Sequence, residues 1–145
     1  MRAIVCAALL ATVVLAGCSG GDDEQGLPKS EFIAQSEAIC TKHAEAQDKI
    51  FDSIPSDATT AQTAEIFLKQ AIPDYKAQQK ELRAVKPPED DADEIDAIYD
   101  DADDAIATLE KDLRDDPEAA LGAPESPLAD VNARMKAYGL TACAQ

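Results

Sequence analysis

The spacing of the apolar residues is the sequence feature that most constrains the fold. Along four segments, residues 30–54, 60–85, 89–115 and 126–138, apolar side chains recur at steps of three and four, which is the period of an amphipathic helix. No stretch shows sustained alternation of apolar and polar residues, as a half-buried strand would, and no internal repeat is evident. The sequence therefore predicts an all-α fold.

The ends of these segments carry residues that start, stop or distort helices. Ser30 is expected to cap the first helix and Pro55 to stop it. Pro73 lies inside the second segment and is expected to kink it, because proline lacks a backbone donor and crowds the preceding turn. Residues 116–124 are expected to end the third helix and form a loop, and Gly139 is expected to give the fourth helix a left-handed C-cap.

The first residues have the layout of an export signal. A positive start, Met1-Arg2, precedes an apolar run that is too short to span a membrane. The run leads to Leu15-Ala16-Gly17-Cys18, which closely resembles a bacterial lipobox. That resemblance implies cleavage before Cys18 and a diacylglycerol on its sulfur, and two acyl chains at one residue give stable membrane attachment.

We therefore expect three parts: a signal peptide over residues 1–17, the lipidated Cys18 with a flexible acidic tether over 18–29, and a helical domain over 30–145. The mature protein is expected at the cell membrane, held by its N-terminal lipid on the extracytoplasmic face.

The cysteine count predicts one disulfide. Cys6 would leave with the signal and Cys18 would carry lipid, so Cys40 and Cys143 remain as a pair. An exported setting favours the oxidised form of such a pair.

The architecture expected from four helices with short connections is an up-down-up-down bundle. With a rise of about 1.5 Å per residue, Cys40 lies about 15 Å along the first helix, and the short fourth helix ends near the same height. A disulfide would then tie the C-terminus to the first helix, so the arrangement of the helices and the pairing support each other.

The charge of the chain limits its partners and suggests one alternative function. It has 13 basic and 29 acidic residues, for a net charge of −16, and nucleic acids and anionic surfaces favour clustered Lys and Arg instead. Acids are densest over residues 89–104, and carboxylates are ligands of Ca²⁺. The alternative function is therefore a cation-binding module at the cell surface, with candidate ligands Asp93, Asp96, Asp100, Asp103 and Asp104.

The favoured interpretation of the same acids is a solvated helix face. No glycine lies between Glu89 and Asp115 to form a binding loop, and consecutive carboxylates on a helix diverge around its axis. No metal site is therefore predicted.

His43 is the only histidine and lies one turn from Cys40. With Cys143 these residues would supply three zinc ligands, or Cys40 and His43 a nucleophilic pair. A disulfide would abolish both arrangements. No phosphate loop, nucleophile elbow or zinc-protease motif is present, so we predict no catalytic residues, no cofactor and no enzymatic activity.

One ligand groove is also considered. Pro73 would free a carbonyl and open a space between helices, with Phe67 and Tyr75 nearby. The competing interpretation is that Pro73 only bends its helix around the core.

The lipobox is accompanied by five further motifs: Phe32-Ile33, Ala38-Ile39-Cys40, Ile72-Pro73, residues 82–88 (LRAVKPP) and residues 138–143 (YGLTAC). Together these resemble small lipoproteins and secreted helical proteins that are common in actinobacteria. The resemblance covers nearly the whole mature chain and implies an envelope location and a Cys40–Cys143 bridge. It carries over no catalytic residues.

The functional hypothesis from the sequence is a membrane-anchored envelope lipoprotein that acts as a non-enzymatic binding domain. Its partner would be an envelope protein or a small ligand near the membrane.

Overall fold

The protein is all-α, as predicted. The computed structural model describes residues 26–144, and within that range it contains helices and turns but no strand. Cys18, the signal and most of the tether lie outside the described residues. The helices are α1 (Lys29–Asp52), α2 (Thr60–Ile66), the π-helix η1 (Phe67–Ala71), α3 (Ile72–Arg83), the 3₁₀-helix η2 (Glu89–Asp91), α4 (Ala92–Asp115), α5 (Pro117–Leu121) and α6 (Ala129–Tyr138).

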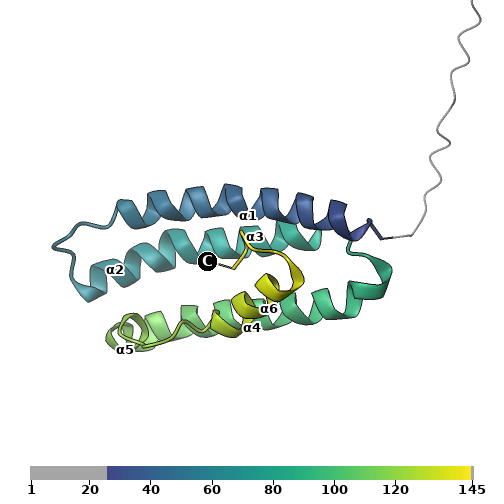
Figure 1. Cartoon of the computed structure of the whole chain (residues 1–145). Coiled ribbons are helices and arrows are strands. Elements are labelled where there is room, and N and C mark those ends of the chain that lie inside the picture. Colours follow the sequence, from purple (N-terminus) through teal and green to yellow (C-terminus); the bar gives the residue numbers. More distant parts are fainter. Residues whose placement is uncertain (1–25, 145) are drawn as a thin grey trace, which may run out of the picture.

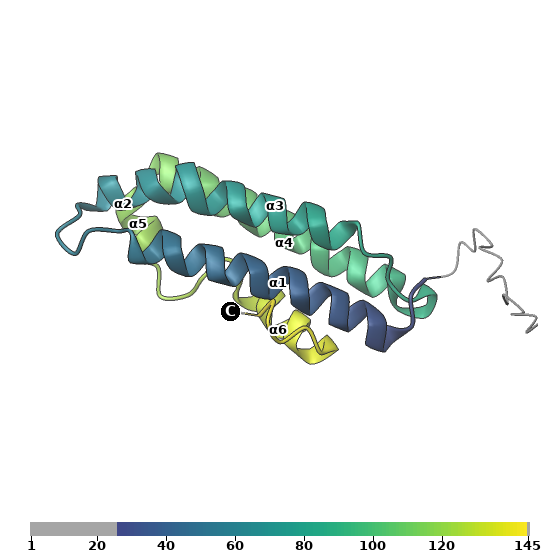
Figure 2. The same ribbon diagram turned by 90° about the horizontal axis from the view of Figure 1, so that it is seen from above.

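The longest helices lie side by side (Figures 1 and 2). The chain runs along α1, returns through α2, η1 and α3, and then runs along α4; α3 packs against both α1 and α4. The short helix α5 packs against α2 and α4, and α6 packs against α4. No helix within residues 26–144 is both long and apolar enough to cross a membrane.

The start of α1 differs from the prediction. The helix begins at Lys29, and Pro28, not Ser30, occupies the N-cap position, where no side chain caps the helix. The backbone carbonyl of Pro28 accepts hydrogen bonds from the N–H groups of Glu31 and Phe32, at 2.9 and 3.0 Å. Because the helix begins two residues earlier than expected, Ser30 lies inside its first turn.

The irregularity expected at Pro73 is a π-helical turn. The N–H of Ile72 donates to the carbonyl of Phe67, five residues earlier, and α3 then starts with Pro73 in its first turn. A proline in a regular α-helix would crowd the carbonyl four residues before it. The wider π turn lies immediately before the proline and changes the spacing of those carbonyls.

The loop predicted after the third helix is wrong in part, because residues 117–121 form α5. The side chain of Asp116 accepts a hydrogen bond from the N–H of Ala119 at 3.0 Å, and Pro117 takes the first helical position. An Asp cap followed by proline favours helix initiation, and five residues are too few to show a periodic pattern.

The core consists of two clusters of buried side chains. The larger one includes Phe32, Leu82, Ile98, Tyr99 and the two disulfide cysteines. Within it, the rings of Phe32 and Tyr138 make an edge-to-face contact at 6.0 Å between centroids. The smaller cluster lies toward α2 and α5, and its buried members are Ala64, Ile72, Ile106 and Leu113.

The predicted C-cap at Gly139 is confirmed. Gly139 has a φ of 111° and ends α6 in the left-handed conformation. The N–H of the following Leu140 donates to the carbonyl of Met135 at 2.9 Å, and the Leu140 side chain is fully buried. This cap turns the chain back toward α1, where Cys143 is needed.

Replacing Gly139 with alanine should lower the free energy of unfolding by about 1–2 kcal/mol, because an L-residue is strained in the left-handed region. The added Cβ would also lie 3.3 Å from Cδ1 of Ile33. Gly139→Asn should be less destabilising, since Asn tolerates this conformation better. Urea unfolding followed by circular dichroism measures both variants, and an alanine variant as stable as the wild type would contradict the role of the cap.

Candidate functional site

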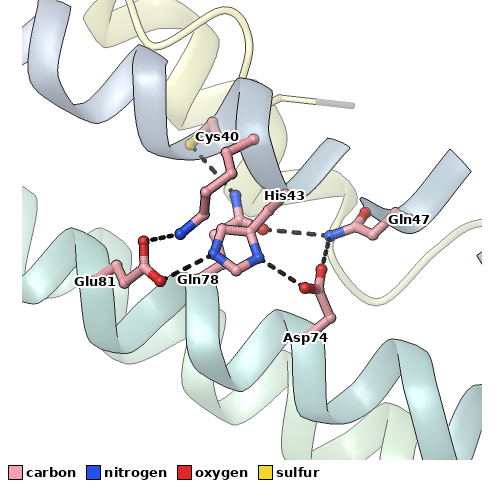
Figure 3. A network of polar contacts seen from close by, with 7 residues as sticks. Cys40, His43, Gln47, Asp74, Gln78 and Glu81 are labelled. Carbon is pink, nitrogen blue, oxygen red and sulfur yellow. Dashed lines mark hydrogen bonds and ion pairs between the residues drawn. The ribbon is translucent and has the colours of Figure 1, made fainter. Parts of the chain in front are cut away.

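A group of contacting polar side chains surrounds His43 in the interior of the protein. This residue lies on α1 and is only 4% exposed. Its Nδ1 atom is 2.8 Å from Oδ1 of Asp74, and its Nε2 atom is 3.5 Å from Oε1 of Glu81. Both carboxylates belong to α3, so the imidazole ring is held between two acids of the neighbouring helix (Figure 3).

Amide side chains extend this contact to the disulfide. The Nε2 atom of Gln47 donates to the second oxygen of Asp74 at 3.1 Å and lies 3.3 Å from Oε1 of Gln78. The Nε2 atom of Gln78 is in turn 3.3 Å from the Sγ atom of Cys40. A continuous polar network therefore joins α1 to α3 and ends at the disulfide (Figure 3).

The outer end of the network is an ion pair. Lys42 on α1 donates to Oε2 of Glu81. This hydrogen bond is the main reason why the pKa of Glu81 lies below its usual value, and the charges of Lys42 and His43 act in the same direction. The ionised form of Glu81 is thus favoured in the folded protein.

Acid should destabilise the protein through such carboxyl groups. Glu81 has a lower pKa folded than unfolded, so its contribution to stability is present above the unfolded pKa and disappears as the pH falls through the folded value. The same holds for Asp91, whose pKa is lowered first by the hydrogen bond from Tyr138 and then by that from Lys29. We expect the midpoint temperature of thermal unfolding to decrease as the pH is lowered from 5 to 2. The decrease should be less steep in Glu81→Gln, which lacks this carboxyl group. A midpoint independent of pH over this range would contradict the prediction.

The predicted disulfide is confirmed. Cys40 and Cys143 are bonded, with their Cα atoms 4.9 Å apart. Glu37, one turn before Cys40, accepts a hydrogen bond from the N–H of Ala142 at 2.8 Å. The segment after α6 is therefore fixed to α1 both covalently and by a side chain.

The bonded cysteines exclude the two reactive interpretations of Cys40 and His43. A nucleophilic pair needs a free thiol beside the imidazole, and a zinc site needs thiolates. In this structure both sulfurs are used by the disulfide, and the second nitrogen of His43 faces Glu81. Across residues 26–144, no group of three or more His, Cys, Asp or Glu side chains is arranged to hold a metal ion.

The acids proposed as a cation-binding face lie on the outside of α4. Asp100 and Asp103 both accept from Arg83 of α3, at 2.8 and 2.7 Å. Asp93, Asp96 and Asp104 are exposed, and the described residues offer them no ion pair. Two of the five candidates are thus engaged with an arginine.

The three residues of the predicted ligand groove lie in separate surroundings. Pro73 is exposed on α3, and the ring of Phe67 packs against that of Phe51 at 5.4 Å. Tyr75 lines a different space, a small central cavity between α1, α3, α4 and α6. Phe67 and Tyr75 instead pack against the second core cluster.

The central cavity is too small for an organic ligand. Its volume is about 40 Å³, which is room for about three water molecules, whereas ligand pockets measure about 300–1,000 Å³. Gln79 lines this cavity, and its buried Oε1 atom has no hydrogen-bond partner among the described residues. The cavity therefore has room for water, but not for an organic ligand, beside the disulfide.

No family model matches the chain, and neither the curated proteins nor the solved structures include a significant match.

Most of the polar network was not predicted from the sequence. His43 was a candidate site residue, whereas Asp74, Gln78 and Glu81, which surround it, were not. The available signal was the spacing of Asp74 and Glu81, seven residues apart, which places both on one face of a helix. Nothing in the sequence indicated that this face would meet α1.

Proposed function

We propose that this chain is a lipid-anchored envelope protein whose helices form an up-down-up-down bundle, and that it acts as a non-enzymatic binding domain for a protein partner. The observation that carries the proposal is the filled interior. The central cavity has a volume of about 40 Å³, and the polar groups around it connect helices to each other. A partner therefore has to bind at the surface.

The surface charge supports a protein partner with basic groups. The chain carries a net charge of −16. Several exposed acids of α4 have no cationic partner among the described residues, Asp93, Asp96 and Asp104 among them. Electrostatic complementarity of this kind increases the rate of association and excludes partners of like charge.

A lipid anchor at Cys18 would determine which partners the domain can meet. A lipid at this residue and the acidic tether that follows would keep the domain close to the membrane without fixing its orientation. A binding domain held in this way encounters envelope proteins and not those of the cell interior.

The experiment is site-specific photo-crosslinking in cells that produce the full chain. A photoreactive amino acid replaces Asp93 or Asp104 on α4, and Lys80 on α3 serves as the matched exposed control. We expect a discrete crosslinked protein with the α4 positions only, and its loss when Cys18→Ser releases the chain from the membrane. A specific catalytic turnover that a point substitution abolishes would overturn the proposal, as would equal crosslinking from all three positions.

A further inference from the structure

A groove with an apolar floor lies at the end of the molecule that is far from the start of α1. It is formed by the last turns of α4, by α5 and by the segment that leads to α6, and its volume is about 290 Å³. Figures 1 and 2 both place α5 at the opposite end from the start of α1. A chain held at its N-terminus would present this groove away from its attachment point.

The floor and walls of the groove are apolar. Leu109 and Ala120 lie in the floor, where they pack against the second core cluster. Ala119 and Pro127 are exposed and form part of the walls. These side chains offer an aliphatic surface to an occupant and no hydrogen-bonding group.

The rim of the groove carries three carboxylates. Asp112 is half-buried, and none of the hydrogen bonds or ion pairs of the described residues involves its carboxylate. Its charge still acts on Lys111, whose pKa is raised mainly by the hydrogen bond to Asp115 and to a smaller extent by Asp112. Asp115 has only an exposed pair with Lys111 at 2.8 Å, and such pairs are weak. Asp116 uses one oxygen to cap α5, which leaves its second oxygen available.

We propose that this groove binds a lysine or arginine side chain presented by the protein partner. The inference rests on the proposed function and names the chemistry that the partner must offer. A basic side chain combines an aliphatic stem with a cationic head. The aliphatic stem would pack on Leu109 in the floor, and the cationic head would pair with the carboxylate of Asp112, which makes no hydrogen bond within the described residues. Anionic side chains are excluded by the rim.

The test uses the isotope-labelled full chain in detergent micelles and two short peptides. One is acetyl-Leu-Arg-Leu-amide, and the other contains citrulline in place of arginine, which keeps the shape but removes the charge. The amide signals of Ala119, Ala120 and Ala123 are followed by NMR during titration. We expect saturable shifts with the arginine peptide, and binding that is roughly fivefold weaker with the citrulline peptide.

Two variants separate the groove from the general charge of the chain. Asp112→Asn should weaken binding of the arginine peptide roughly fivefold, whereas Asp48→Asn, an exposed acid on α1 outside the groove, should leave it unchanged. A urea-unfolding curve confirms that each variant is folded. Equal weakening by both variants, or equal binding of both peptides, would overturn the inference.

Other occupants of the groove are further outcomes of the same experiment. Agmatine is a free organic cation that carries the same guanidinium group as arginine, and it should bind more weakly than the peptide. Equal affinity of agmatine and the peptide would overturn the inference that the ligand is a protein side chain. Analytical sedimentation should show that the chain does not self-associate through this surface. A dimer that dissociates in the Asp112→Asn variant would identify a second copy of the chain as the occupant instead. If the peptide fails to bind while crosslinking from α4 succeeds, the groove is excluded and the proposed function stands.

Discussion

Reduction of the Cys40–Cys143 disulfide is expected to lower the free energy of unfolding by about 4–5 kcal/mol in the chain-entropy model. The reason is the length of the closed loop, since 103 positions separate the two cysteines. Small domains have a total stability of about 5–15 kcal/mol, so reduction should leave a marginally stable protein. Urea unfolding with and without a thiol reductant, followed by circular dichroism, gives the difference directly.

The double variant Cys40→Ala/Cys143→Ala is the control for that measurement. It should resemble the reduced wild type in stability, and reductant should have no further effect on it, although Cys6 and Cys18 are still present. A change of less than about 1 kcal/mol on reduction would mean that contacts such as Glu37 with Ala142, and the buried Leu140, hold the C-terminal segment without the covalent bond.

The second large effect is expected at His43. Substitution by leucine should lower the free energy of unfolding by about 3 kcal/mol, because it leaves the carboxylate of Asp74 largely buried and without its hydrogen bond to His43. The Asp74 side chain is only 16% exposed. It would keep the hydrogen bond from Gln47, which cannot replace the lost contact.

A double-mutant cycle tests this explanation. His43→Leu/Asp74→Leu should be less destabilised than His43→Leu alone, since no unpaired carboxylate remains beside the leucine. Removal of an exposed pair provides the comparison, and Lys111→Ala should change stability by less than about 0.5 kcal/mol. Additive effects of the two leucine substitutions would show that His43 and Asp74 are not coupled.

The helical regions could be predicted from the sequence because amphipathic periodicity is a local property. The long helix α4 follows directly from its stripe of Ile95, Ile98, Tyr99 and Ile106. Gly139 could be assigned a left-handed conformation because few other residues adopt it readily. The five-residue helix α5 was too short to show a period, and its only signal was Asp116 followed by Pro117.

The candidate site was less predictable because it depends on packing between helices. The sequence indicated that His43 would lie on α1 near Cys40, and that Cys40 would pair with Cys143. It did not indicate which of the 29 acids would meet the imidazole. That choice depends on how α1 and α3 align, and the π turn before Pro73 is part of what sets the position of Asp74.

The position of the disulfide also affects how the chain withstands proteases. Cys40 and Cys143 enclose nearly all of the helical region in one covalent ring. A single cut in an exposed connection, such as the turn after α1 or the segment between α5 and α6, would give two fragments that stay joined through sulfur. The nicked protein would migrate as one species until a reductant is added, and the C-terminal fragment would remain attached to the part of the chain that carries the N-terminus.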